Sequence, residues 1–343
     1  MTPEPRRFDA PLPNLDGASI LVTGGTGSFG RAFVATVLAR WKPARLVVFS
    51  RDELKQYDMQ HDPLIAGRDC MRFFIGDVRD QNRLDSAMRE VDVVIHAAAL
   101  KQIMAAEYNP FECIHTNVMG AENVVQAAIR NRVKRVVALS TDKAASPINL
   151  YGASKLASDK IFVAGNNMAG DIATRFSVVR YGNVLGSRGS VVPHFRRLIA
   201  EGATELPITD ERMTRFWITL QQGVAFVLSS LAVMRGGEIF VPKIPSSTVV
   251  ELARAMAPDL PLKAVGIRPG EKLHEAMITE DDARVTVEMD DRYVIEPSFG
   301  WWDRKAYRDD AARPVAEDFV FASNRNAETL SRAALAALIA DLP

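Results

Sequence analysis

The feature that most constrains the fold is an apolar strand pattern, a glycine-rich turn and a helical pattern in direct succession near the start of the chain. The strand pattern covers 19–23, the turn contains Gly24, Gly27 and Gly30, and the helical pattern ends at Arg40. Glycines at this spacing let the backbone turn tightly and approach a phosphate, and they let the helix lie close to the strand. The helix N-terminus then offers unpaired amides to an anion. A glycine-rich connection without a ligand is the alternative, but the elements that follow favour a dinucleotide site.

Strand and helix patterns then alternate along the first half of the chain. Strands are expected at 46–50, 72–76, 91–97, 135–139 and 177–180, and helices at 52–61, 80–90, 110–131 and 151–168. Right-handed crossovers join such strands into a parallel sheet covered by helices. We therefore expect an α/β fold, with a Rossmann-type doubly wound parallel sheet and a smaller mixed α/β substrate-binding domain. The expected divisions are a flexible lead at 1–14, a cofactor-binding domain at 15–182, and a substrate domain mainly within 183–343, with some segments returning to the sheet.

The charge balance excludes some classes of partner. Lys and Arg total 42 and Asp and Glu total 42, so there is no electrostatic reason to expect nucleic acid or an anionic membrane. No window reaches the roughly 18 apolar residues of a membrane helix, and residues 1–14 lack a signal-peptide core. Cys70 and Cys113 lack metal-ligand spacing, and no histidine has it. We expect a reduced, cytoplasmic protein without a metal.

The end of the second strand predicts which cofactor is bound. An NAD site usually has an acidic residue there, but this chain has Ser50 and Arg51, with Lys55 one turn later. These donors suit a 2′-phosphate, so NADP is favoured over NAD; the alternative is that Arg51 only pairs with Asp52 or Glu53 on the surface. The predicted cofactor-binding residues are Gly24, Thr26, Gly27, Ser28, Phe29, Gly30, Ser50, Arg51, Lys55, Asp77, Val78, Ala97, Ala98, Ala99, Tyr151 and Lys155.

The stretch from 140 to 155 holds the candidate reactive groups. The strand at 135–139 delivers Thr141, Asp142 and Lys143 to its carboxyl end, where ligands bind in open α/β sheets. Tyr151 and Lys155 follow on one face of one helix, four residues apart. The Lys155 cation and an oxidised nicotinamide nearby favour the phenolate, so we expect a lowered pKa at Tyr151. The alternative is that Tyr151 and Lys155 form an ordinary surface pair.

Several motifs together resemble a known family. Thr23-Gly24-x-x-Gly27-x-x-Gly30, His96-Ala97-Ala98-Ala99, Asn117 and Tyr151-x-x-x-Lys155 are similar to the extended short-chain dehydrogenase/reductases over roughly the first 185 residues. The stretches 100–110, 140–144, 180–190, 213–217 and 268–275 resemble the inverting UDP-N-acetylglucosamine 4,6-dehydratases that open pseudaminic acid synthesis, and this likeness runs from about 15 to 296. One departure is Ile103-Met104, where that family usually has Val-Pro, so the preference near the acyl group is left open.

The resemblance implies a mechanism for these residues. Tyr151 deprotonates the sugar 4-hydroxyl, Thr141 hydrogen-bonds the same oxygen, and Asn117 anchors Lys155 through the backbone or a water. We assign Lys143 as the base at C5 and Asp142 as the acid at O6, giving a 4-keto-6-deoxy-arabino-hexose. A lysine base must be neutral, so this assignment requires a lowered pKa at Lys143. The alternative is that Asp142 caps a turn and Lys143 contacts a phosphate or a carbonyl, as in a simple 4-epimerase.

The substrate site and partners are also implied. A guanidinium suits a diphosphate because its donors form a planar fork, although each arginine is as well explained by a surface ion pair. The predicted substrate-binding residues are Lys101, Gln102, Asn183, Ser187, Arg188, Arg215, Arg268 and Glu271. We expect UDP-N-acetylglucosamine as substrate and a homo-oligomer, a dimer or a hexamer. A UDP-sugar 4-epimerase and a non-catalytic NADP-binding regulator remain alternatives, and 300–313 is either a surface-packing loop or an oligomer contact.

Overall fold

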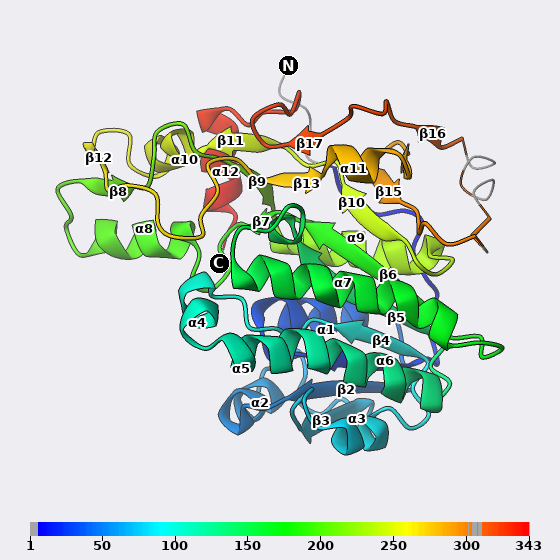
Figure 1. Cartoon of the computed structure of the whole chain (residues 1–343). Coiled ribbons are helices and arrows are strands. Elements are labelled where there is room, and N and C mark those ends of the chain that lie inside the picture. Colours follow the sequence, from blue (N-terminus) through cyan, green and yellow to red (C-terminus); the bar gives the residue numbers. More distant parts are fainter. Residues whose placement is uncertain (1–5, 301, 304–306, 308–310, 343) are drawn as a thin grey trace.

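A large sheet organises the chain (Figure 1). The computed structural model describes residues 6–300, 302–303, 307 and 311–342. The strand order is β16-β14-β15-β10-β6-β5-β4-β1-β2-β3, and β10 to β3 run parallel. These strands are β1 (Ser19–Thr23), β2 (Arg45–Ser50), β3 (Met71–Ile75), β4 (Val93–His96), β5 (Arg135–Thr141), β6 (Arg175–Tyr181), β10 (Ile239–Pro242), β14 (Thr286–Glu288), β15 (Arg292–Ile295) and β16 (Arg313–Pro314). The predicted α/β fold with a doubly wound parallel sheet is confirmed.

Helices cover both faces of this sheet, which is why its central strands are apolar on both sides. Helices α3, α6 and α7 pack together on one face, and α1 packs with α9 on the other. The helices are α1 (Ser28–Arg40), α2 (Glu53–Gln60), α3 (Gln81–Ala87), α4 (Ile103–Tyr108), α5 (Pro110–Ile114), α6 (Gly120–Arg130), α7 (Leu150–Met168), α8 (Val191–Ala200), α9 (Leu220–Val233), α10 (Val249–Met256), α11 (Glu280–Ala283) and α12 (Arg332–Ala340). A π-helical segment, His115–Met119, joins α5 to α6 within the predicted helix at 110–131.

The second half of the chain divides between the large sheet and smaller units. Strands β10, β14, β15 and β16 extend the large sheet, the last three antiparallel. Helices α8, α10 and α12 lie to one side of it (Figure 1), around apolar clusters separate from the main core. The short strands are β7 (Asn183–Val184), β8 (Leu206–Ile208), β9 (Thr214–Ile218), β11 (Ser246–Thr248), β12 (Leu262–Ala264), β13 (Ala276–Ile278) and β17 (Phe321–Ala322).

Two segments whose structure the sequence left open pack on the body. The described part of the expected flexible lead, 6–14, is fixed: Phe8 is 4% exposed, and its ring lies 5.0 Å from that of Phe226. Residues 6–14 thus lie against the body of the protein, since burying an aromatic ring offsets the entropy of ordering a short segment. Within 300–313, Trp302 and Tyr307 are buried, and Trp302 Nε1 donates to Glu296 at 3.1 Å.

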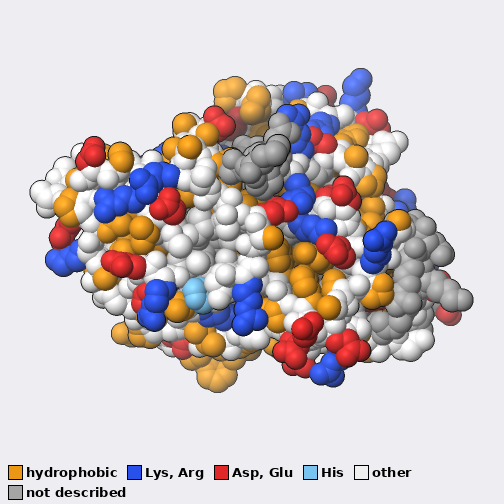
Figure 2. Space-filling view, turned by 90° about the horizontal axis from the view of Figure 1, so that it is seen from above, with side chains coloured by type: hydrophobic (Ala, Val, Ile, Leu, Met, Phe, Trp, Pro, Cys, Tyr) orange, Lys and Arg blue, Asp and Glu red, His pale blue; other side chains and the backbone are white. Residues whose placement is uncertain are grey.

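The surface has a mixed charge. Acidic and basic side chains are interspersed on the face in Figure 2, as the equal totals of the two signs lead one to expect. Among the helices of the described ranges, none is both long and apolar enough to cross a bilayer.

Candidate active site

A cavity of about 620 Å³ runs along the carboxyl ends of the parallel strands. All predicted cofactor-binding residues line it, from Gly24, directly after β1, to Lys155 on α7. Thr141, Lys143, Tyr151 and Lys155 also line it, whereas the predicted acid, Asp142, is 0% exposed and is not among the lining residues. The cavity therefore joins the glycine-rich turn to the reactive stretch.

The glycine-rich turn fits a dinucleotide. Gly24 has φ +65°, and a Cβ there would lie 2.9 Å from the backbone nitrogen of Ala98. A Cβ at Gly30 would lie 2.4 Å from the Cα of Gly25, so a side chain would push α1 away from the turn. Helix α1 has no side-chain cap at Gly27, which leaves its first amides available to a phosphate. Three buried oxygens of cavity-lining residues, Thr116 Oγ1, Asn183 Oδ1 and Ser190 Oγ, have no hydrogen-bond partner among the described residues.

The two cations after β2 already have carboxylate partners. Arg51 Nη1 lies 3.5 Å from Asp77 Oδ2, and Lys55 Nζ pairs with Asp52. The pairing of Arg51 is thus with Asp77, not with the Asp52 or Glu53 considered from the sequence. The Arg51 side chain is 53% exposed and lines the cavity. It remains close enough to the cofactor groove to exchange this weak surface pair for a phosphate.

Tyr151 and Lys155 lie on the buried face of α7. Lys155 Nζ donates to the Leu139 carbonyl at 2.7 Å, and burial lowers its pKa while Asp159 opposes that shift. Burial raises the pKa of Tyr151 to about 12, even though the Lys143 ammonium and a hydrogen bond to Thr141 lower it. The lowering of the Tyr151 pKa expected from Lys155 and an oxidised nicotinamide is therefore not produced by the chain's own residues. Burial outweighs the cations because removing water penalises the phenolate most.

Asn117 sits in the π-helical segment, where the extra residue turns its side chain toward the loop after β4. Its Oδ1 accepts from Leu100 N at 2.8 Å, and its Nδ2 donates to Leu100 O at 2.9 Å and to Ser154 Oγ at 2.9 Å. The predicted anchoring of Lys155 is not among these contacts. Asn117 instead fixes the loop that carries Lys101, through Leu100. It also fixes Ser154, the residue beside Lys155.

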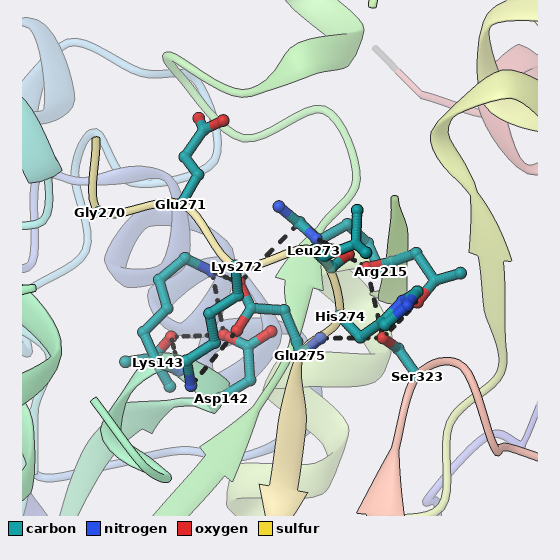
Figure 3. A network of polar contacts seen from close by, with 12 residues as sticks. Asp142, Lys143, Arg215, Gly270, Glu271, Lys272, Leu273, His274, Glu275 and Ser323 are labelled. Carbon is teal, nitrogen blue, oxygen red and sulfur yellow. Dashed lines mark hydrogen bonds and ion pairs between the residues drawn. The ribbon is translucent and has the colours of Figure 1, made fainter. Parts of the chain in front are cut away.

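Lys143 lies between two buried carboxylates (Figure 3). Its Nζ is 3.0 Å from Asp142 Oδ1 and 3.4 Å from Glu275 Oε1. Burial alone lowers the pKa of Lys143, but the charges of Asp142 and Glu275 outweigh it and raise the pKa above its ordinary value. The base assignment requires a lowered pKa at Lys143. In this structure the pKa is raised, which contradicts that expectation. Sequence reasoning counted the cations near Lys143 and missed one of its two anions.

Glu275 is the residue that sequence reasoning missed. It is 2% exposed and directly precedes β13, and Arg215 Nε and Lys272 Nζ each lie 3.9 Å from its carboxylate. Its Oε2 and the Oδ2 of Asp142 have no hydrogen-bond partner within the described part of the chain. Glu275 ends the 268–275 stretch that the family resemblance singled out, which was the available signal. Nothing in local periodicity predicts that it meets Lys143.

The predicted substrate residues fall into two groups. Lys101, Asn183, Ser187 and Arg188 line the cavity, and Lys101 Nζ donates to the Arg188 carbonyl at 3.0 Å. The remaining predicted residues, Gln102, Arg215, Arg268 and Glu271, are not among its lining residues.

Those four residues make other contacts. Gln102 packs against Gly189, where a Cβ would lie 2.7 Å from its amide nitrogen. Arg268 pairs with Glu271 at 3.9 Å, and Glu271 points away from the Lys143 network (Figure 3). Arg215 belongs to that network through Glu275.

A second buried charge network lies behind the reactive stretch. Arg180 Nη2 is 3.3 Å from Asp159 Oδ2, and Ser140 Oγ donates to the same oxygen at 2.8 Å.

His96 is also buried, with Nδ1 2.8 Å from Thr23 Oγ1, and burial together with the Lys155 cation lowers its pKa to about 3. His96 is therefore a neutral structural residue. Across the described ranges, no group of His, Cys, Asp and Glu is arranged to hold a metal ion.

The chain is similar to proteins of known name and structure. A sequence profile described as polysaccharide biosynthesis protein matches residues 20–297. A protein of Campylobacter jejuni subsp. jejuni serotype O:23/36 (strain 81-176), named UDP-N-acetylglucosamine 4,6-dehydratase (inverting), is 54% identical over 94% of this chain and 98% of its own length. One of the same name from serotype O:2 (strain ATCC 700819 / NCTC 11168) is 59% identical over 83% of this chain and 85% of its own.

Solved structures agree with the fold. The X-ray structure of Pen from Bacillus thuringiensis matches with a TM-score of 0.86 and 34% identity, covering 95% of this chain and 98% of that one. The dTDP-glucose 4,6-dehydratase DesIV from Streptomyces venezuelae, with NAD and TYD bound, matches with a TM-score of 0.65 and 26% identity over 74% and 86%. The profile match and these identities show that the chain belongs to the polysaccharide biosynthesis protein family, within the extended short-chain dehydrogenase/reductases.

Proposed function

We propose that the protein is an inverting UDP-N-acetylglucosamine 4,6-dehydratase that uses bound NADP and forms UDP-2-acetamido-2,6-dideoxy-arabino-hexos-4-ulose. The observation that carries the proposal is Lys143, which lines the cavity with Thr141 and Tyr151 and pairs at 3.0 Å with the buried Asp142. The names of the two Campylobacter jejuni relatives support it. An acid and a base beside the redox tyrosine are what water elimination needs in addition to oxidation.

A bound nicotinamide would supply the redox chemistry, as acceptor of the C4 hydride and donor of the hydride to C6. The glycine-rich turn would hold its diphosphate, Asp77 and Val78 its adenine, and Ala97 to Ala99 leave room for it along β4. NADP is favoured over NAD because Arg51 and Lys55 offer donors to a 2′-phosphate and no acidic residue ends β2.

The chain's own residues move the protons. Tyr151 takes the proton of the 4-hydroxyl while Thr141 hydrogen-bonds the same oxygen. Lys155, one turn further along α7, holds a positive charge on the same helix face as the phenol. Once C4 is a ketone, the C5 proton becomes acidic; Lys143 removes it, and Asp142 protonates O6 so that water leaves. Lys143 is a cation before the reaction begins, so it must lose a proton before it can act as the base at C5.

The rest of the cavity is assigned to the nucleotide sugar. Lys101 and Gln102 line the sugar end, and Asn183, Ser187 and Arg188 follow β6 at the carboxyl edge. We infer that Arg188, with Arg215 or Arg268, binds the diphosphate and that Glu271 accepts the ribose hydroxyls. Residues 183–343 would thus supply most of the substrate domain. A homo-oligomer in the cytoplasm, at the start of pseudaminic acid synthesis, is part of the same proposal.

A UDP-sugar 4-epimerase is the second candidate. A protein of Rickettsia canadensis (strain McKiel) named UDP-glucose 4-epimerase is 43% identical over 81% of this chain and 82% of its own length. Mass spectrometry of UDP-N-acetylglucosamine incubated with pure protein separates the candidates. A dehydratase gives a product lighter by one water, with deuterium at C5 in heavy water. An epimerase leaves the mass of the sugar nucleotide unchanged in ordinary water, and this result would remove the first proposal.

A further inference from the structure

Ser154 carries a buried hydroxyl at which separate parts of the chain meet. It lies on α7 between Tyr151 and Lys155 and is 3% exposed. Its Oγ donates to the Tyr151 carbonyl at 2.8 Å and accepts from Asn117 Nδ2 at 2.9 Å. The Cys113 thiol donates to the same oxygen at 3.4 Å. A hydroxyl has one proton and two lone pairs, so these bonds use its full capacity.

Asn117 extends this connection from Ser154 to the loop after β4. Its side-chain amide makes two hydrogen bonds with the backbone of Leu100: Leu100 N donates to Oδ1 at 2.8 Å, and Nδ2 donates to Leu100 O at 2.9 Å. Asn117 is 1% exposed and Cys113 is 0% exposed, so bulk water does not reach the cluster. Loss of one partner therefore leaves a buried polar group poorly paired.

The loop that Asn117 fixes brings Lys101 to the cavity. Lys101 directly follows Leu100, lines the cavity and donates through Nζ to the Arg188 carbonyl at 3.0 Å. Arg188 lines the same cavity from the segment after β7. Covalent bonds and hydrogen bonds thus run without a gap from the carbonyl of Tyr151 to that of Arg188. The two ends of this connection belong to two residues that line one cavity.

We propose that Ser154 is a positioning residue for the nucleotide sugar: it holds Asn117, and through it the loop at 100–102, so that Lys101 keeps a fixed place relative to Tyr151. The inference deepens the proposed dehydratase function and rests on it, because that function assigns Lys101 to the sugar end of the cavity. Neither Ser154 nor Asn117 is among the residues that line the cavity. Ser154 therefore acts through the loop and does not touch the ligand.

Ser158 provides the matched control. It lies one turn further along α7 and is 1% exposed, but its Oγ has no hydrogen-bond partner in the described part of the structure. Ser158→Ala therefore removes a buried hydroxyl without breaking a bond. Ser154→Ala takes an acceptor away from Asn117, whose second amide proton then has only the Cys113 sulfur, a weak acceptor at 3.5 Å. The two variants share the substitution, the helix and the burial.

The first test needs neither cofactor nor substrate. Hydrogen–deuterium exchange of the full chain, read by mass spectrometry on peptides that cover 98–104, reports on the Leu100 amide, which Asn117 protects. Exchange there should be several-fold faster in Ser154→Ala and unchanged in Ser158→Ala. Ser154→Cys, which keeps a weak acceptor in the same place, should be intermediate. Equal exchange in all four proteins, or acceleration spread over the whole chain in Ser154→Ala, would reject the connection.

The second test separates binding from chemistry. With UDP-N-acetylglucosamine, Ser154→Ala should raise KM roughly three- to tenfold, the fold-change that corresponds to one net hydrogen bond. Its kcat should stay within about twofold of wild type, because Tyr151 keeps its place on α7 and only the hold on Lys101 is loosened. Ser158→Ala should change neither constant. A fall in kcat with an unchanged KM would show that the substitution disturbs Tyr151 instead, and it would overturn the assignment.

Lys101→Met tests whether the effect on KM runs through the loop. Without the Lys101 amine there is no group left to position, so Ser154→Ala should raise KM far less in the Lys101→Met background than in wild type. Two increases in KM that simply multiply in the double variant would contradict the connection. If the wild-type protein releases no water from UDP-N-acetylglucosamine, the proposed function fails instead, while the exchange result at Leu100 still stands.

Discussion

Arg180 should be a far larger contributor to stability than its distance to Asp159 alone indicates. Both side chains are buried, at 2% and 1% exposure, and lie 3.3 Å apart. At an effective dielectric constant of about 20 the attraction is about 5 kcal/mol. Arg180 also donates to the Met277 carbonyl at 3.0 Å, a bond with a net contribution of about 1 kcal/mol. Replacing Arg180 by Met removes both and leaves Asp159 buried without its main counter-charge, so the free energy of unfolding should fall by about 3–5 kcal/mol.

Urea unfolding of single and double variants measures this. Arg180→Met with Asp159→Asn should recover much of the loss, since no unpaired charge is left buried. Arg284→Met is the matched control: its ion pair with Asp281 has a similar distance of 3.4 Å, but the side chains are 72% and 91% exposed, and the cost should stay within about 1 kcal/mol. If the two single costs simply add in the double variant, or if Arg180→Met costs no more than Arg284→Met, the reasoning from burial is refuted.

Two further predictions concern acid stability and cofactor choice. The folded-state pKa of His96 lies below its unfolded value of 6.5, so the unfolded chain binds the extra proton and stability is lost as pH falls. Relative to His96→Gln, the wild-type free energy of unfolding should fall by about 1.4 kcal/mol per pH unit below pH 6.5, and parallel urea titrations at pH 7 and 5.5 check the sign. Arg51→Ala should weaken NADP binding about 10- to 100-fold, the loss of one charge-assisted bond, and leave NAD binding nearly unchanged. Equal weakening of both in a titration would dismiss Arg51 as the 2′-phosphate ligand.

The large sheet was predictable because its strands are signalled locally. Buried parallel strands have continuous apolar runs such as 135–139, and the glycine-rich turn can be recognised from its spacing. The cavity lining followed from topology, since parallel strands deliver their carboxyl ends to one edge. The π-helical turn around Asn117 was not predictable, because one extra residue in a helix leaves the apolar period nearly unchanged. The placement of Phe8 depended on a distant partner, Phe226.

The protonation states could not be predicted because they depend on contacts across more than a hundred residues of sequence. Lys143 was expected to be neutral on the strength of nearby cations, yet Glu275 meets it from the segment before β13. Tyr151 was expected to have a lowered pKa because of Lys155 and an oxidised nicotinamide, but burial raises its pKa and Lys155 donates to the Leu139 carbonyl. A motif gives the kinds of groups present, whereas their charges depend on everything packed against them.

This dependence bears on how a dehydratase differs from an epimerase. Both reactions require the tyrosine to exchange a proton with the 4-hydroxyl, but an epimerase returns that proton to the same oxygen, whereas a dehydratase sends one proton away with water. A dehydratase therefore needs a route from the tyrosine to the leaving hydroxyl. Thr141 donates a hydrogen bond to Asp142 here, and Asp142 and Glu275 together keep Lys143 charged. The adjacent acid and lysine are thus insufficient by themselves. The charge state of the pair, and with it the proton that the elimination can use, depends on Glu275 as well.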